Sequence, residues 1–177
     1  MIAVSGGPRH RRDVGRVFRG WLFLLTAAVA LPAAETDAER GFARLKSLAG
    51  NWLITEEGKD YAGTITIVAH GTAVAQHSDF LLVFHRDHDG LRATLFEDDD
   101  NQPRFRSPGL PEGSKILRFD FVDATNVKPH AAVATGLTLV FDAADRFTQR
   151  WTFKQDDRET HLEIVYRRSP PNAVSKP

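Results

Sequence analysis

The stretch FARLKSLAGNWLITEEG, residues 42–58, contains the features that decide the fold. Its first half has the periodicity of an amphipathic helix, and Gly50 is the kind of residue that commonly ends one. After the glycine the pattern becomes that of a strand, which begins with Trp52. The stretch therefore predicts a short helix that stops at Gly50 and leads directly into a strand.

The predicted helix has a start signal and one apolar face. Thr36 and Glu39 have the spacing of a capping box, in which each side chain binds the backbone of the other residue. Phe42, Leu45 and Leu48 follow at intervals that place them on the same side of the helix. A helix this short is marginal alone, so we expect it to lie on an apolar surface.

The rest of the chain alternates apolar and polar residues with the period of β-strands. Turn signals such as Asp89-Gly90 separate the alternating segments. The clearest alternating segments are 64–67, 116–121, 137–142, 147–154 and 162–167. We count about ten strands at the spacing typical of a barrel or sandwich.

The N-terminal residues 1–34 have the composition of a secretory signal. Five arginines precede the uncharged run WLFLLTAAVALPAA, residues 21–34, which ends in small residues. The run is shorter than the about 20 residues that a membrane-spanning helix needs. We therefore predict cleavage and a periplasmic or secreted protein without a membrane span; an uncut signal anchor is the alternative. The barrel domain is expected at 35–170 and a disordered tail at 171–177.

The charge and cysteine content of the mature part limit its partners. From Glu35 onward there are 18 Lys and Arg against 22 Asp and Glu, a net charge of −4. The absence of a basic stripe or tail in the sequence argues against a nucleic-acid partner. The sequence has no cysteine, so disulfides and thiolate chemistry are excluded.

The segment from Gly50 to Trp52 resembles the Gly-x-Trp signature of the calycin barrels, which include lipocalins and fatty-acid-binding proteins. The resemblance implies an antiparallel up-and-down barrel, closed at one end by the N-terminal helix. It also implies that Trp52 packs across an arginine of the last strand. By strand parity this partner is Arg168, with Arg167 as the second choice.

A narrower resemblance covers nearly the whole mature chain, from about Phe42 to Arg168. The segments 42–52, 87–91, 101–104 and 119–126 resemble those of a family of secreted bacterial proteins of unknown function with a lipocalin-like barrel. That family usually has a Thr-His-Tyr-Cys run where this chain reads TLFE, residues 94–97. Chemistry that requires the missing His and Cys is therefore not expected here.

The candidate ligand-binding residues combine aromatic and polar side chains. Gln149 lies between Phe147 and Trp151 on one strand face, which suits either a cavity or a core with one satisfied polar residue. Amides and a guanidinium near the barrel mouth could bind a carboxylate or carbonyl of a ligand, or instead hold the loops of the rim. The predicted ligand-binding set is Phe84, Asn101, Gln102, Arg104, Phe119, Phe121, Asn126, Gln149, Trp151 and Phe153.

Other polar clusters have simpler interpretations, and no cofactor or metal is expected. The acidic run 97–101 and the segment 85–89 could contact calcium or zinc, but both are more typical of solvated turns. His161 could ligate haem only if it pointed inward, and its parity points outward. The pair Glu56 and Glu57 is interpreted as solvated.

The sequence best fits an exported protein that binds a small lipophilic or amphipathic molecule in a barrel cavity. No motif requires an enzyme, although an isomerase or hydrolase on a calycin barrel is an alternative. An inward acid or base with a shifted pKa would favour that alternative. A barrel filled by side chains, serving as an envelope interaction module, is the third; a cavity well below about 300 Å³ would favour it.

Overall fold

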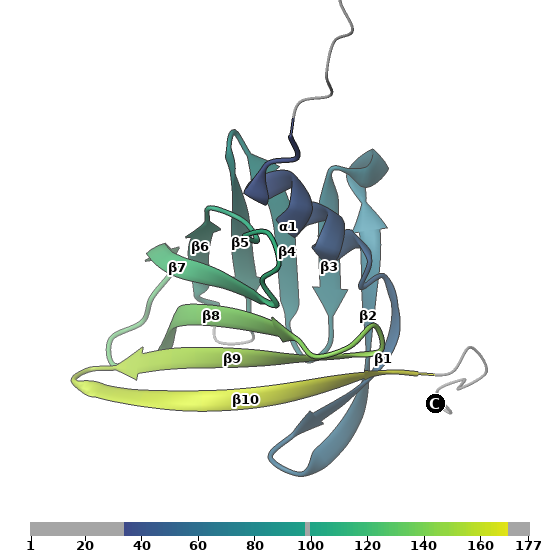
Figure 1. The fold of residues 1–177 in the computed structure, drawn as a ribbon. Helices are drawn as coiled ribbons and strands as arrows, with labels where there is room; N and C mark the ends of the chain where they lie inside the picture. The colour runs from purple at the N-terminus through teal and green to yellow at the C-terminus, as the bar shows by residue number, and fades with distance from the viewer. Residues whose placement is uncertain (1–33, 98–99, 170–177) are drawn as a thin grey trace, which may run out of the picture. The chain divides into compact units, whose positions relative to one another are not determined.

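One short helix and ten strands make up the part of the chain that the structure, a computed structural model, describes, residues 34–97 and 100–169 (Figure 1). Helix α1 spans Asp37–Lys46, and a 3-10 turn, η1, spans Ala69–Gly71. The strands are β1 (Gly50–Glu56), β2 (Lys59–Val68), β3 (Ala73–His77), β4 (Leu81–Asp87), β5 (Gly90–Phe96), β6 (Gln102–Ser107), β7 (Ile116–Thr125), β8 (Val133–Phe141), β9 (Arg146–Gln155) and β10 (Arg158–Arg168).

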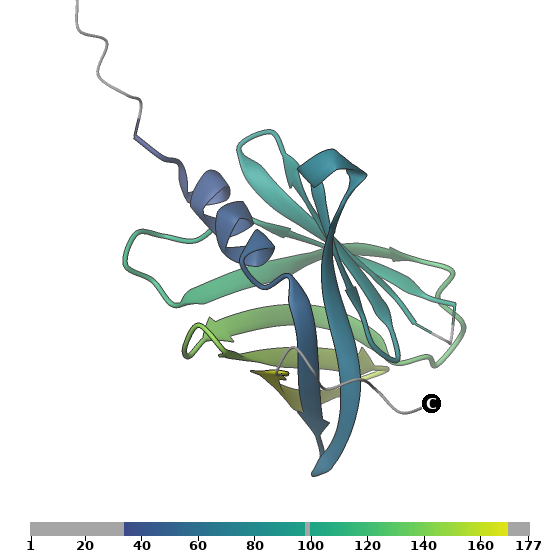
Figure 2. The same cartoon turned by 90° about the vertical axis from the view of Figure 1, so that its right-hand side faces the viewer.

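The sheet closes on itself. Each strand pairs antiparallel with its neighbours in sequence, and β1 pairs with β10. In the closing pair Trp52 lies opposite Arg168 and Ile54 lies opposite Tyr166. Closure satisfies the edges that an open sheet would leave unpaired. The predicted all-β antiparallel up-and-down barrel with an N-terminal helix is therefore confirmed (Figures 1 and 2).

The half of the barrel next to α1 is filled by aromatic side chains. Alternation along each strand turns every second side chain inward. The Trp52 ring meets the edge of Phe147 at a centroid distance of 4.9 Å, and Phe147 stacks on Tyr166 at 4.3 Å. All three side chains are almost completely buried. This half is therefore a packed aromatic core.

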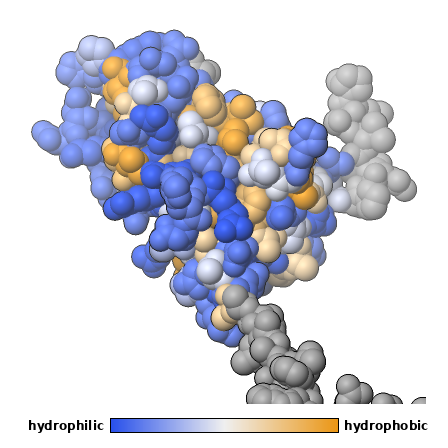
Figure 3. Space-filling model, turned by 90° about the horizontal axis from the view of Figure 1, so that it is seen from above, coloured by the Kyte–Doolittle hydropathy of each residue, from blue (hydrophilic) through white to orange (hydrophobic). Residues whose placement is uncertain are grey.

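Helix α1 covers this packed end of the barrel (Figures 1 and 2). The predicted capping box is present: the Thr36 hydroxyl accepts from the Glu39 amide, and the Glu39 carboxylate accepts from the Thr36 amide. Phe42, Leu45 and Leu48 are buried against the barrel, as the spacing predicted. The outer surface of this end is hydrophilic over its centre, with apolar patches at its flanks (Figure 3).

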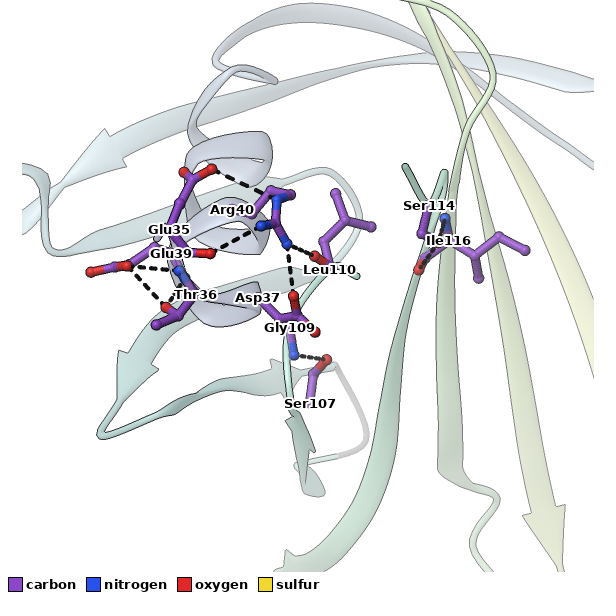
Figure 4. A network of polar contacts seen from close by, with 10 residues as sticks. All are labelled: Glu35, Thr36, Asp37, Glu39, Arg40, Ser107, Gly109, Leu110, Ser114 and Ile116. Carbon is purple, nitrogen blue, oxygen red and sulfur yellow. Dashed lines mark hydrogen bonds and ion pairs between the residues drawn. The ribbon is translucent and has the colours of Figure 1, made fainter. Parts of the chain in front are cut away.

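The loop between β6 and β7 anchors the start of α1 (Figure 4). The Leu110 amide donates to the Asp37 carbonyl at 2.9 Å. Arg40 donates to the Leu110 carbonyl at 2.9 Å and to the Asp37 carboxylate at 2.7 Å. Gly109 has a φ of +116°, and a Cβ there would overlap the Asp37 carbonyl. Only glycine can therefore bring this loop so close to the helix.

The helix ends earlier than the sequence predicted. Its last residue is Lys46 and Ser47 is its C-cap, so Gly50 does not end it. Gly50 instead begins β1 with a φ of +140°, and a Cβ there would lie 2.6 Å from the Arg168 guanidinium. Glycine is favoured because a φ of +140° strains any residue that has a Cβ, and the Arg168 guanidinium would also have to shift to make room for one.

Arg168 joins the last strand to the helix exit. Its guanidinium lies 4.5 Å from the ring centroid of Trp52, so the expected pairing is present in the structure. The same group donates to the carbonyls of Ser47 and Ala49 at 3.0 and 2.9 Å. These carbonyls lack helical partners because the helix has just ended. Arg168 is thus a structural residue at the packed end.

The predicted position of Phe121 in a closed apolar wall is wrong. Its side chain is 38% exposed, although its ring lies 6.3 Å from that of Phe105. Pairing between β7 and β8 ends at Asp120 and Gly136, so β8 does not cover β7 beyond that point. Phe121 therefore lines a separate groove where β7 and β8 are no longer paired.

Candidate functional site

A cavity of about 280 Å³ opens at the end of the barrel opposite α1. The ends of β1, β5 and β9, the start of β10 and the turn between β3 and β4 form it. Its lining residues are Glu56, Asp79, Phe80, Leu95, Glu97, Trp151, Phe153, Leu162 and Ile164. We refer to this space as the mouth cavity.

Three aromatic rings form much of the wall of the mouth cavity. Trp151 is 2% exposed, and it meets Phe80 edge-on at a centroid distance of 6.0 Å and Phe153 at 6.2 Å. Phe80 and Phe153 are half-buried and pack against the core. Phe80 and Phe153 present apolar surface at the entrance, where a ligand would remove it from water.

A hydrogen-bond network extends from Trp151 into the barrel interior. It joins four buried side chains, those of Gln76, Gln149, Trp151 and Tyr166. The Trp151 indole and the Tyr166 hydroxyl both donate to Gln149 Oε1, at 3.2 and 2.9 Å. Gln149 Nε2 donates to Gln76 Oε1 at 2.7 Å, and Gln76 Nε2 donates to the Tyr166 oxygen at 2.8 Å. Burial of so many polar atoms is tolerated because each has a partner.

This network answers the question raised by Gln149 in the sequence. The residue is completely buried, it does not line the mouth cavity, and both of its amide atoms are bonded within the protein. Gln149 is therefore a satisfied polar residue of the core. Its effect on the cavity is indirect, because it fixes the orientation of the Trp151 ring.

Carboxylates surround the entrance of the mouth cavity. Glu56 lies at the end of β1, Asp79 in the turn between β3 and β4, and Glu97 directly after β5. The Tyr61 hydroxyl donates to the Glu56 carboxylate at 2.6 Å. Burial, followed by this hydrogen bond and the negative charge of Glu56, raises the pKa of Tyr61 well above its ordinary value. Tyr61 therefore stays protonated and acts as a donor.

The aromatic residues predicted for ligand binding divide between the cavity and the core. Trp151 and Phe153 line the mouth cavity. Phe84 and Phe119 are 2% exposed, do not line it, and pack against each other at a centroid distance of 5.5 Å.

The predicted amide residues lie around loops instead of inside the barrel. Asn101 is buried, and its amide donates to the Ala132 carbonyl at 3.2 Å. Gln102 accepts a hydrogen bond from Thr125 at 3.1 Å. Gln102 and Asn126 line a separate pocket on the outside of the barrel end. These contacts favour the alternative in which the amides hold the loops in place.

Arg104 does not lie at the mouth cavity. Its guanidinium forms two hydrogen bonds with the Asp123 carboxylate, at 2.6 and 2.7 Å, and both side chains are half-exposed. The physical reason is strand parity, because its neighbours Pro103 and Phe105 turn inward and Arg104 turns outward. A polar contact between Arg104 and a ligand in the cavity would require a different register.

The acidic lining residues were missed in the sequence, although two of them had a signal. Glu56 continues the inward series of β1 that begins with Trp52, whereas Glu57 lies exposed in the turn. Glu97 continues the inward series of β5 after Leu95. Extending strand parity by one step would have placed both carboxylates at the entrance. Glu56, interpreted from the sequence as a turn residue, thus ends β1 and lines the entrance of the cavity.

Other predicted features lie away from the mouth cavity or outside the described residues. His161 is exposed, as its parity predicted, and lies 3.4 Å from Glu159. Within residues 34–97 and 100–169, no group of three or more His, Cys, Asp and Glu could hold a metal ion. In the same residues no helix has the length and apolar composition to cross a bilayer. The predicted signal, up to residue 33, and the predicted tail lie outside what the structure describes.

In comparisons with models of known protein families and with curated proteins, the chain matches none.

Proposed function

We propose that this protein is an exported binding protein that holds a small lipophilic or amphipathic molecule in the mouth cavity. The observation that carries the proposal is the aromatic-walled space of about 280 Å³ at the end of a barrel whose other end is packed and covered. Ligand sites are typically concave, largely apolar and provided with a few polar groups. The signal-like residues 1–34 and the resemblance to lipocalin-like exported proteins support the same proposal.

The dimensions of the cavity limit the ligand. Typical ligand pockets begin at about 300 Å³, so this one suits a small molecule with one to three rings, or a short chain. The buried network under Trp151 prevents deeper entry, because opening it would leave several polar atoms without partners. The alternative of a filled barrel fits the half next to α1 but not the mouth.

The enzyme alternative has one observation in its favour. Glu56 lines the mouth cavity, and an inward carboxylate is a potential general base. Tyr61 would then hold Glu56 in place as a hydrogen-bond donor, because its raised pKa keeps the hydroxyl protonated. Binding is the better-supported function, because it requires only the aromatic walls and the space between them.

A direct fluorescence titration with an apolar dye tests the binding function. The uncharged dye N-phenyl-1-naphthylamine, whose fluorescence rises in apolar sites, is added to the purified protein. Leu162→Trp fills the entrance, and Leu53→Trp is its matched control on the outer face of β1, where Leu53 is 39% exposed. Circular dichroism checks that both variants fold.

We expect saturable dye binding to the wild type and to Leu53→Trp, with similar affinity. Leu162→Trp should bind about tenfold more weakly or not at all. Equal binding to all three proteins would place the dye on another surface and refute the proposal. The proposal is also refuted if neither the dye nor any of the ligands described below binds saturably to the wild type.

A further inference from the structure

All charged side chains that line the mouth cavity are acidic. They are Glu56, Asp79 and Glu97, and the other lining residues are aromatic or aliphatic. No lysine, arginine or histidine of the described chain is among them. The net charge of −4 from Glu35 onward has the same sign. The entrance therefore attracts cations and repels anions before any contact is made.

The protein itself does not neutralise two of these carboxylates with a basic group. The Glu56 carboxylate accepts from the Tyr61 hydroxyl, which is an uncharged donor. Among the ion pairs formed between described residues, none includes Glu56 or Asp79. On the outer surface, by contrast, Asp123 has the guanidinium of Arg104 at 2.6 Å. Negative charge at the entrance is thus available to a ligand.

The effect of these charges reaches into the barrel. Burial is the main reason why the pKa of the Tyr166 hydroxyl is raised, and the charges of Glu56 and Asp79 raise it further. Tyr166 belongs to the network beneath Trp151. Apolar walls lie between the carboxylates and this network, and water screens electrostatic interactions poorly across them. The charges therefore act over a longer distance.

The walls of the cavity suit the same kind of ligand. Trp151, Phe80 and Phe153 offer ring faces and edges within a small space. Ring faces attract cations, and tryptophan does so most strongly. Aromatic rings combined with carboxylates can hold an ammonium group and the apolar group attached to it at the same time.

We infer that the ligand of the mouth cavity is an amphipathic cation, an alkyl- or arylammonium ion whose apolar part lies against Trp151 and whose charge lies among Glu56, Asp79 and Glu97. The inference rests on the proposed binding function and names its ligand class. The inferred ligand is positively charged. From the sequence, by contrast, Arg104 and the amides were expected to bind a carboxylate or carbonyl of the ligand.

Three ligands of similar size and different charge test the inference. Benzyltrimethylammonium is the cation, neopentylbenzene is its uncharged isostere, and 3-phenylpropionate is the anion. Each competes with N-phenyl-1-naphthylamine at low salt, and saturation-transfer NMR detects direct binding without the dye. The test variant is Glu56→Gln combined with Asp79→Asn. The control is Glu112→Gln, which removes an exposed carboxylate in the loop between β6 and β7, at the opposite end of the barrel.

We expect the cation to bind about tenfold or more tightly than its isostere, and the anion to bind most weakly. The preference should disappear in the double variant, persist in Glu112→Gln and weaken as salt is raised. Equal binding of cation and isostere, or preference for the anion, would overturn the inference and leave the binding function intact. A preference unchanged in the double variant would overturn it too. If none of the three ligands and no dye binds, both proposals fail.

Discussion

Replacing Gln149 by leucine tests whether the network beneath the mouth cavity is as tightly connected as its geometry indicates. Leucine is similar in size to glutamine and is common in barrel cores, so the main effect of the substitution is the loss of hydrogen bonds. Three groups lose a partner: the Trp151 indole, the Tyr166 hydroxyl proton and the Gln76 carbonyl. At about 1 kcal/mol for each orphaned buried group, the variant should be about 3 kcal/mol less stable.

A double-mutant cycle makes the reasoning sharper. Gln76→Leu alone orphans the Gln149 amide and removes one donor from the Tyr166 oxygen, which should cost about 1–2 kcal/mol. With both glutamines replaced, only the Trp151 indole and the Tyr166 hydroxyl lack partners, a loss of about 2 kcal/mol. The double variant should therefore be more stable than Gln149→Leu alone.

Urea unfolding of the four proteins, followed by circular dichroism, measures the cycle. For a protein of this size a loss of about 3 kcal/mol moves the midpoint by about 1 M or more. The expected interaction between the two sites is about 2–3 kcal/mol. Additive losses within about 0.5 kcal/mol, or a loss below about 1 kcal/mol for Gln149→Leu, would refute the idea that the network acts as one unit.

Two further predictions concern the helix anchor and the buried hydroxyls. Gly109→Ala should lower the free energy of unfolding in urea by about 3 kcal/mol, because φ is +116° and a Cβ there meets the Asp37 carbonyl. The control Gly113→Ala, where φ is positive but the space is open, should lower it by about 1 kcal/mol. Equal losses in the two variants would contradict the argument. The pKa values of Tyr61 and Tyr166 are raised on folding, so the unfolded chain releases these protons first. The contribution of these two hydroxyls to stability should be constant below about pH 10 and be lost above it. Tyr61→Phe should reduce this alkaline fall, and a fall of the same size in the variant would exclude a contribution from Tyr61.

Features of the packed end were predictable because their signals are local or come in pairs of fixed geometry. The capping box depends on two residues three positions apart, and the helix face depends on a simple period. The Trp52 and Arg168 pair needed one long-range assumption, that the first and last strands meet, and the calycin resemblance supplied it. The end of the helix was predicted less well, because Gly50 does not cap the helix and instead begins β1 with a positive φ beside Arg168.

The candidate site was predicted only in part, because strand parity does not say where neighbouring strands separate or end. Trp151 and Phe153 were placed correctly at the cavity, since β9 is regular along its length. Phe121 fits the same alternation on β7, but the pairing with β8 stops one residue before it. Arg104 was judged by residue type alone, and its position between two inward residues decides its direction.

The meeting of Glu56, Asp79 and Glu97 could not be inferred from any single segment, because barrel closure brings together the ends of strands that are distant in sequence. Their arrangement also has an electrostatic implication. The fields of carboxylates that meet at one entrance add, so a single positive charge there interacts with all three at once. This summed attraction for a cation belongs to the closed barrel and to no single segment of it.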